Sequence, residues 1–198
     1  MKLYDISQEV FTCEVYPGDP RPTRAVLCDP SQGDLYRLSS FTMCAHNGTH
    51  VDAPAHFLAD GATVEAIPLA KTVGPCYVAE HTGELAAADA ARILSEARAR
   101  DAEAARRILI KGEATVTQAA AEVFAAACVD LLGNESQSVG PLHAPMAVHM
   151  CLLQADVVLL EGVRLAHVPT GVYLLHAAPL KLGGLEGAPC RAVLIDLS

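Results

Sequence analysis

The sequence contains no tryptophan, and only 5% of its residues are aromatic. A packed core must therefore come mainly from aliphatic side chains, and these are plentiful, because 52% of the residues are hydrophobic and the mean hydropathy is +0.28. This composition supports one large core. No stretch resembles a linker long enough to separate two units. We therefore expect a single globular domain spanning residues 1–198.

Basic residues are also scarce, with 14 Lys and Arg against 23 Asp and Glu and a formal net charge of −9. Nucleic acids and anionic membranes attract proteins through clustered Lys and Arg. The one local group, around residues 98–107, lies near the end of a predicted helix and is expected to be a solvated face. We therefore expect neither a nucleic-acid partner nor a membrane partner.

The seven cysteines form no Cys-x2-Cys pair, and their odd number favours free thiols in a reducing compartment. No window reaches the roughly 18 uncharged apolar residues of a membrane span, and residues 1–5 lack the apolar core of a signal peptide. These absences predict a cytoplasmic protein. Cys44 could be a nucleophile or a ligand, but the interpretation we favour is a small buried hydrophobe.

The first half of the chain is rich in strand-like segments, whereas strands and helices alternate in the second half. This alternation is typical of α/β proteins with parallel strand pairs. A helix with an exposed face is expected over residues 84–100, and further helices over 117–127 and 145–154. Strands are expected over residues 3–6, 24–28, 35–45, 76–79, 107–111, 129–132, 157–160, 171–178 and 191–197.

The most informative stretch is residues 46–57, which hold three of the eight histidines. His46, His50 and Asp52 form a His-x3-His-x-Asp pattern, which supplies three donors for a first-row divalent metal within seven residues. Gly48 and Pro54 oppose a helix at this point. The pattern therefore predicts a strand and a turn that together form a metal site. The alternative is a set of surface-loop histidines without a ligand.

An extended segment explains how the three donors could meet. Side chains alternate along a strand, so His50 and Asp52 point the same way, and a turn at Asn47-Gly48 can fold His46 back beside them. Three donors leave the shell of a metal incomplete, so further ligands are expected in later parts of the chain. The candidates there are Glu113, Glu135, His143, His149, Glu161, His167 and His176.

Glu161 stands out among these candidates because it ends the apolar run 157–160 and precedes a glycine. The carboxyl end of a buried strand is where α/β folds place functional groups, and a buried carboxylate is costly without a cation. His149 lies on the predicted helix just before that strand, and it is either a ligand or a partly exposed helix residue.

At this point the sequence resembles a known family. The segment 46–57, with its pattern His-x-Gly-Thr-His-x-Asp-x-Pro-x-His-Phe, is similar to the signature of the metal-dependent cyclase family, which includes bacterial kynurenine formamidase and isatin hydrolase. The likeness extends to the Tyr-Pro-Gly-Asp loop at 16–19, to His149-x11-Glu161-Gly162 and to residues 178–192. It implies a single-domain swivelling β/β/α fold that assembles as a homodimer or higher homo-oligomer.

The resemblance also implies a role for each site residue. His46, His50 and Asp52 would hold a first metal ion, Asp52 and Glu161 would bridge to a second, and His149 would complete the second site. His56 would be the catalytic acid and base. One or two divalent ions are expected, with zinc as the first expectation and manganese as the alternative.

Two positions depart from the formamidase pattern. Tyr16 occupies the position that resembles a tryptophan in the wall of the substrate pocket of the kynurenine enzymes. A tyrosine side chain offers less contact area than tryptophan and carries a polar hydroxyl. His149 is followed by Met150, whereas formamidases usually have paired histidines. These changes leave the implied ligands intact and bear on the choice of substrate.

The function implied is a metal-dependent hydrolase of a small amide, arylformamidase-like, which converts N-formylkynurenine to kynurenine and formate with a metal-activated water. Its alternative is a ring-opening hydrolase of a cyclic imide, lactam or lactone, as in isatin hydrolase. A non-catalytic metal-binding or small-molecule-binding protein on the same fold is the alternative of another class, because a fold does not fix a function.

Overall fold

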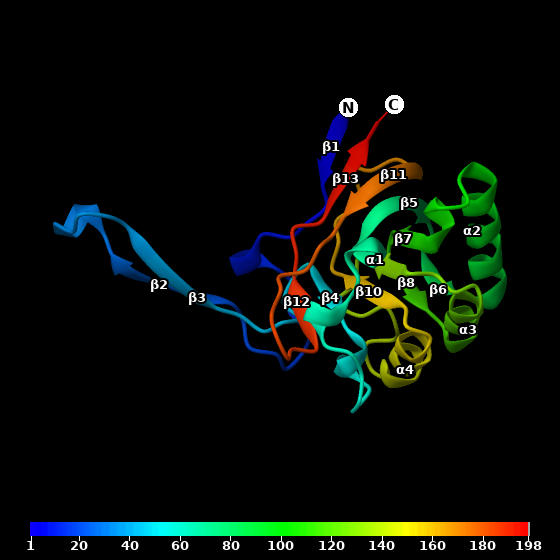
Figure 1. Cartoon of the computed structure of the whole chain (residues 1–198), viewed down its shortest axis with the longest axis horizontal. Coiled ribbons are helices and arrows are strands. Elements are labelled where there is room, and N and C mark those ends of the chain that lie inside the picture. Colours follow the sequence, from blue (N-terminus) through cyan, green and yellow to red (C-terminus); the bar gives the residue numbers. More distant parts are fainter. Residues whose placement is uncertain (198) are drawn as a thin grey trace.

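The chain folds as an α/β protein built on one curled sheet of nine strands, in a computed structural model that describes residues 1–197 (Figure 1). The helices are α1 (Leu69–Thr72), α2 (Ala87–Arg100), α3 (Gln118–Ala126) and α4 (Met146–Gln154). The strands are β1 (Lys2–Asp5), β2 (Thr23–Cys28), β3 (Leu38–Thr42), β4 (His50–Asp52), β5 (Val73–Glu80), β6 (Gly83–Leu85), β7 (Arg107–Lys111), β8 (Ala114–Val116), β9 (Leu131–Asn134), β10 (Val158–Glu161), β11 (Gly171–His176), β12 (Gly187–Pro189) and β13 (Val193–Asp196).

The large sheet has the order β1-β13-β11-β5-β7-β9-β10-β4-β12. Its middle strands, from β5 to β10, pair in parallel, as the alternation of strands and helices predicts. The strands toward both ends pair antiparallel. This arrangement is the swivelling β/β/α fold that the resemblance implies.

Two hydrophobic cores lie on the two faces of the parallel strands. On one face α2, α3 and α4 pack through buried side chains such as Ile93, Phe124 and Leu152 (Figure 1). The other face packs against the antiparallel end strands through residues such as Tyr4 and Leu194. Because both faces are covered, the middle residues of the parallel strands are apolar on both sides, and the charged residues lie at the strand ends.

The expected helices lie close to their predicted positions, and α2 carries the buried face Ala90, Ile93, Leu94 and Ala97. Thr117 caps α3, since its side chain accepts a hydrogen bond from the amide of Ala120. Within residues 1–197, no helix combines the length and apolarity that crossing a membrane would require.

The strand expected over 35–45 is shorter than predicted. It begins at Leu38, ends at Thr42 and pairs only with β2, and this two-stranded hairpin stands away from the body (Figure 1). It therefore does not run directly into the motif, which enters the large sheet separately as β4. All five residues of β3 are exposed, so this hairpin has no core to cover.

A buried arginine at the start of β7 links this strand to α1 and β5. The Arg107 side chain is only 4% exposed and forms ion pairs with Asp130 and Glu103 at 3.4 and 3.5 Å. It also donates hydrogen bonds to the carbonyl oxygens of Lys71, Pro75 and Ala70. The neighbouring Arg106 reaches the same Asp130 at 2.8 Å, but its side chain is 53% exposed.

We predict that Arg107→Ala lowers the free energy of unfolding by about 3 kcal/mol, because it leaves a carboxylate and three carbonyls without their buried donor. Arg106→Ala, the matched control, should cost less than about 1 kcal/mol because its ion pair is half exposed. Urea denaturation of both variants measures the difference. Equal losses would contradict this account of Arg107.

Candidate metal centre

Residues 50–52 of the motif form the three-residue strand β4, which pairs with a strand on each side in the large sheet. Strand β4 lies between β10 and β12, and its pairing sets Glu161 opposite His50. Residues directly opposite in an antiparallel pair project from the same face. The register therefore places the Glu161 and His50 side chains together, with an oxygen-to-nitrogen distance of 3.5 Å between Oε2 and Nε2.

The turn before β4 folds His46 back onto the strand, as expected. Gly48 has a φ of +65°, and a Cβ at this position would lie 2.9 Å from the Cβ of Cys13, so the turn needs glycine. The Nδ1 atom of His46 then lies 2.9 Å from Oδ1 of Asp52. The opposite ring nitrogen, Nε2, lies 3.2 Å from Oε1 of Glu186.

The distal histidine reaches the cluster from α4. His149 is buried, and its Nε2 atom lies 3.2 Å from Oε1 of Glu161 and 3.8 Å from Oδ2 of Asp52. Its Nδ1 atom lies 2.9 Å from the carbonyl oxygen of Pro145. A carbonyl can only accept, so Nδ1 carries the proton and Nε2 is the nitrogen directed at the carboxylates.

A backbone carbonyl oxygen orients the His50 ring as well. Its Nδ1 atom lies 3.0 Å from the carbonyl oxygen of Gly48, and its Nε2 atom lies 3.3 Å from Oδ1 of Asp52. A backbone carbonyl on the far nitrogen fixes the tautomer and the ring orientation of a metal-ligating histidine. Both buried histidines thus present Nε2 to the centre of the cluster.

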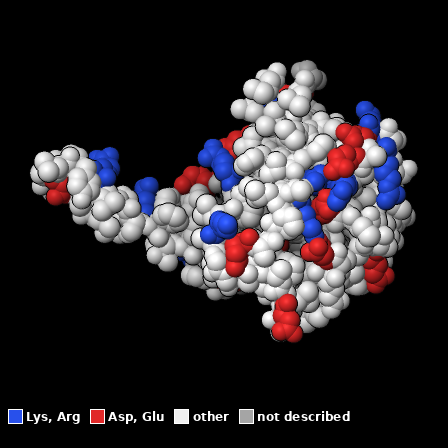
Figure 2. Space-filling model, in the orientation of Figure 1, with Lys and Arg blue, Asp and Glu red and all other residues white. Residues whose placement is uncertain are grey.

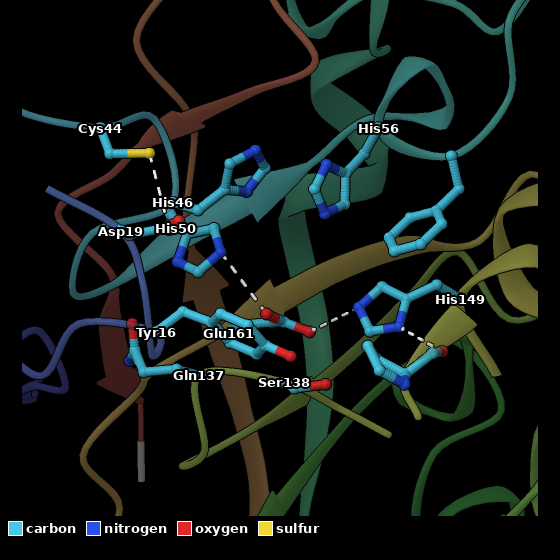
Figure 3. A pocket seen from close by; sticks show the side chains of 12 residues that line it. Tyr16, Asp19, Cys44, His46, His50, His56, Gln137, Ser138, His149 and Glu161 are labelled. Carbon is cyan, nitrogen blue, oxygen red and sulfur yellow. Dashed lines mark hydrogen bonds and ion pairs between the residues drawn. The ribbon is translucent and has the colours of Figure 1, made fainter. Parts of the chain in front are cut away.

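The cluster contains two groups of three side chains that share one carboxylate. One group is His46, His50 and Asp52, the other is Asp52, His149 and Glu161, and within each group the potential ligand atoms lie within 4.8 Å of one another. Figure 3 shows the imidazoles of His50 and His149 on either side of the Glu161 carboxylate, with the His46 ring farther away beside His56. The structure therefore brings together all five residues expected as metal ligands.

The carboxylates of the cluster favour the protonated, positively charged form of its imidazoles. Burial lowers the pKa of His50, but its bonds to Asp52 and Glu161 outweigh burial and raise the pKa to about 10. The pKa values of His46 and His149 are raised above their ordinary value by the same competition, in which the carboxylates outweigh burial. Buried imidazoles otherwise have lowered pKa values.

The two carboxylates show the complementary effect. Burial alone raises the pKa of Asp52, yet hydrogen bonds from His46 and His50 hold it well below its usual range. Glu161 also has a lowered pKa, although burial and the charge of Asp52 oppose ionisation. The cluster thus combines two ionised, fully buried carboxylates with three imidazoles.

The donor set fits a divalent cation. Oδ2 of Asp52 is buried and accepts no hydrogen bond, which is unusual for a carboxylate oxygen in a protein interior. Carboxylate oxygen and imidazole nitrogen are ligands of zinc and manganese. A divalent ion can replace the protons that the histidines otherwise retain. We therefore regard the cluster as a candidate centre for one or two ions.

His56 lies beside the cluster but outside both groups of three, as far as residues 1–197 are concerned. It follows β4 in a short 3-10 helix (Pro54–His56), and its ring stacks on His46 with the centroids 4.1 Å apart. Burial lowers its pKa. The imidazole is thus next to the candidate ligands and lines the same cavity.

His46, His50, His149 and Glu161 line a cavity of about 290 Å³. Tyr16 and Phe57 provide aromatic walls, and the Tyr16 hydroxyl donates a hydrogen bond to the carbonyl oxygen of Leu142 at 2.6 Å. Gln137 and Ser138 also line the cavity (Figure 3). The side-chain oxygen and nitrogen of Gln137 and the hydroxyl of Ser138 are buried without a hydrogen-bond partner.

Several residues differ from the sequence-based interpretation. Cys44 is not a buried hydrophobe: it is half-buried, lines the cavity and has its Sγ atom 3.7 Å from Oδ2 of Asp19. Glu135, a carboxylate candidate, instead accepts hydrogen bonds from the amides of Gly112 and Leu165. His167 packs on the ring of Tyr4, away from the cluster.

Glu186, Gln137 and Ser138 were not identified from the sequence. Glu186 lies in a glycine-rich segment, and the following Gly187 lets His46 approach, because a Cβ there would lie 2.7 Å from Cε1 of His46. A loop glutamine carries no spacing signal of its own. Glu186 and Gln137 reach the site only because segments far apart in the sequence lie together in the fold, so local spacing does not predict them.

The fold and the clustered donors define a swivelling β/β/α protein with a candidate metal centre. The Cyclase family model matches residues 4–141. A kynurenine formamidase from Salinibacter ruber (strain DSM 13855 / M31) is 35% identical, over 99% of this chain and 98% of the relative. The chain therefore belongs to the metal-dependent cyclase family.

Solved structures agree with this assignment. A protein described as a potential metal-dependent hydrolase with cyclase activity is 28% identical, with a TM-score of 0.81 over 98% of this chain and 96% of that chain. Isatin hydrolase A from Labrenzia aggregata has a TM-score of 0.77 at 20% identity, over 98% of this chain and 93% of that chain. The second likeness shows the fold alone.

We predict that Asp52→Asn reduces bound metal by at least about tenfold, because this carboxylate is common to both groups of donors. The amide keeps the shape of the side chain and removes its charge. Elemental analysis after incubation with zinc and gel filtration measures the metal content.

Asp29→Asn, on the exposed hairpin, is the control and should keep the metal content of the unaltered protein. Full occupancy in Asp52→Asn would count against a shared carboxylate ligand.

Proposed function

We propose that the protein is a metal-dependent hydrolase of a small amide, of the arylformamidase type that converts N-formylkynurenine to kynurenine and formate. The observation that carries this proposal is the pair of donor groups sharing Asp52 beside a cavity with aromatic walls. The name of the Salinibacter ruber relative, kynurenine formamidase, supports the same reaction. We also propose that residues 1–198 form one domain of this kind.

The five clustered residues are the proposed ligands. His46, His50 and Asp52 would hold one ion, and Asp52, His149 and Glu161 would hold a second. Zinc is the ion we expect first and manganese the alternative. A divalent ion bound there lowers the pKa of water toward about 7 and polarises the carbonyl under attack.

His56 is the proposed acid and base. Hydrolysis of an amide requires a proton to leave the attacking water and another to reach the departing nitrogen. His56 lines the cavity, adjoins His46 and is outside both donor groups, so its ring nitrogens are available for this transfer. The same imidazole can accept the first proton and return it to the leaving amine.

The cavity supplies the proposed substrate contacts. The Tyr16 ring would stack on an aryl group, while its hydroxyl is held by Leu142. The unpartnered groups of Gln137 and Ser138 would form hydrogen bonds with polar atoms of the substrate, which removes the cost of burying them unpaired.

A ring-opening hydrolase of a cyclic imide, lactam or lactone is the second candidate. It is favoured by Tyr16 and by the buried amide of Gln137, which can pair with an amide in a ring. A non-catalytic metal-binding or small-molecule-binding protein is the candidate of a different class.

We further propose a homodimer and a cytoplasmic location. All seven cysteines are free thiols, which supports a reducing compartment. The proposal of a homodimer follows from the resemblance to the family.

We predict that His56→Ala lowers kcat by about 10²- to 10⁴-fold, the usual contribution of general acid–base catalysis. The bound metal should stay near its original content because His56 lies outside both donor groups. Steady-state kinetics and elemental analysis on the same preparation provide the two measurements. His167→Ala serves as control, since that ring packs on Tyr4. Loss of metal from His56→Ala would make it a ligand and refute its assigned role.

A substrate panel tests the proposed reaction itself. N-formylkynurenine, isatin and simple lactones are incubated with the zinc- or manganese-loaded protein, and products are separated by chromatography. We expect the formamide to be turned over with the highest kcat/KM. Preference for isatin or a lactone would favour ring opening, and no turnover of any compound by metal-loaded protein would favour the binding function.

A further inference from the structure

Glu186 contacts the candidate metal centre from outside both donor groups. Its Oε1 atom lies 3.2 Å from Nε2 of His46, whereas the other ring nitrogen, Nδ1, faces Asp52. Within residues 1–197, neither group of potential ligands includes Glu186. The ligand and catalytic roles proposed above therefore do not involve this carboxylate.

The large sheet holds Glu186 beside His46 through its backbone. Strand β12 pairs with β4, with Gly187 opposite Asp52, and the carbonyl oxygen of Glu186 accepts a hydrogen bond from the amide of Ala53 at 2.8 Å. The register of a strand is strongly specified where one face is buried. Glu186 is therefore placed by pairing with the strand that carries two of the donors.

The loop before β12 is anchored as well. A short 3-10 helix, Val64–Ala66, lies against it, and the amide of its first residue donates a hydrogen bond to the carbonyl oxygen of Leu185 at 2.8 Å. In the same helix, Oε1 of Glu65 accepts a hydrogen bond from the amide of Gly184 at 2.9 Å. The backbone of Glu186 is thus fixed on both sides, although its side chain is 40% exposed.

The sequence also leaves room for the His46 ring at this point. A Cβ on Gly187 would lie 2.7 Å from Cε1 of His46 and 2.9 Å from the carbonyl oxygen of Val51, so a larger residue would displace the ring. Cε1 is bonded to both ring nitrogens. The ring can therefore direct one nitrogen at Asp52 and the other at Glu186 only while this space is open.

The outward nitrogen of each histidine in the centre faces an oxygen, but the oxygens differ in kind. In His50 and His149 this nitrogen is Nδ1 and the acceptor is a backbone carbonyl. In His46 it is Nε2 and the acceptor is the Glu186 carboxylate. A metal-ligating histidine usually donates its second N–H to such an acceptor, which fixes the tautomer and strengthens the ligand. The His46 ring is therefore arranged to keep a proton on Nε2 and to present Nδ1 to an ion.

The charge of Glu186 distinguishes it from the two carbonyl acceptors. A hydrogen bond with an ionised partner is roughly twice as strong as a neutral one. More distant surface charges count for less, because salt screens them beyond about 8–10 Å. Figure 2 shows Lys and Arg interspersed with Asp and Glu over the face of the body in view. The carboxylate in contact with His46 therefore affects this ligand more than the general surface charge does.

We propose that Glu186 is a positioning residue for the metal centre, which accepts the Nε2 proton of His46 and so directs Nδ1 of that ring toward the ion bound with Asp52. This inference rests on the metal centre proposed above, and it adds a partner that contacts a ligand without being one.

The affinity of three variants for zinc tests the proposal. Glu186→Ala removes the acceptor, and Glu186→Gln keeps an oxygen that can accept the same proton but removes the charge. Glu113→Ala, the matched control, removes one negative charge from an exposed position outside both donor groups. Zinc is titrated into each metal-stripped protein in competition with a chromogenic chelator, and thermal unfolding of the metal-stripped proteins checks that each variant is folded.

We expect the Kd for zinc to rise at least about tenfold in Glu186→Ala, which is the usual effect of losing the partner of a ligand. Glu186→Gln should lie between Glu186→Ala and the unaltered protein, and Glu113→Ala should match the unaltered protein. An unchanged Kd in Glu186→Ala, or an equal rise in Glu113→Ala, would overturn the role of Glu186.

The protonated nitrogen of His46 provides a measurement that general weakening of the loop would not change. In assigned ¹⁵N–¹H NMR spectra of the zinc-loaded unaltered protein, we expect the proton of His46 on Nε2 and the protons of His50 and His149 on Nδ1. A proton on Nδ1 of His46 would overturn the proposed orientation.

Failure of the metal centre itself gives a different result. Unaltered protein that binds neither zinc nor manganese would overturn the centre and the role of Glu186 together. Zinc binding that is the same with and without Glu186 would overturn the role of Glu186 alone. Neither measurement requires turnover, so both are independent of the substrate.

Discussion

The structure depends on the burial of two ionised carboxylates within one cluster. Asp52 and Glu161 are fully enclosed, and neither could remain charged there without cationic or hydrogen-bonding partners. Three histidines supply these partners, and the nearby carboxylates raise the pKa values of all three imidazoles. A divalent cation is a ligand that such a group of carboxylates and imidazoles can bind.

The fold assembles this group from three separate segments. Strand β4 carries two donors, the adjacent β10 ends at Glu161, and α4 brings His149 from the side. Antiparallel pairing of β4 with β10 sets the register, so a slip of one residue would turn Glu161 away from His50. The geometry of the centre is thus fixed by the sheet, whereas the cavity wall at Tyr16 comes from a loop.

The sequence predicts the centre better than its surroundings. The spacing from His46 to Asp52 and the position of Glu161 after an apolar run are local signals, and both indicate residues that meet in the structure. Glu186 and Gln137 carry no comparable signal, because their places depend on chain segments that meet only after folding. The sequence predicts the strands of the β2–β3 hairpin but not their separation from the large sheet, since strand propensity does not reveal whether a core lies beneath a strand.

The most direct test of the central claim is the thermal stability of metal-stripped protein titrated with zinc or manganese. If the cluster holds a cation in the folded state, Tm rises with metal concentration, and the stabilisation reaches about 2.7 kcal/mol when free metal is 100 times its Kd. The account predicts this rise for the unaltered protein. A Tm that does not change at any metal concentration would contradict it.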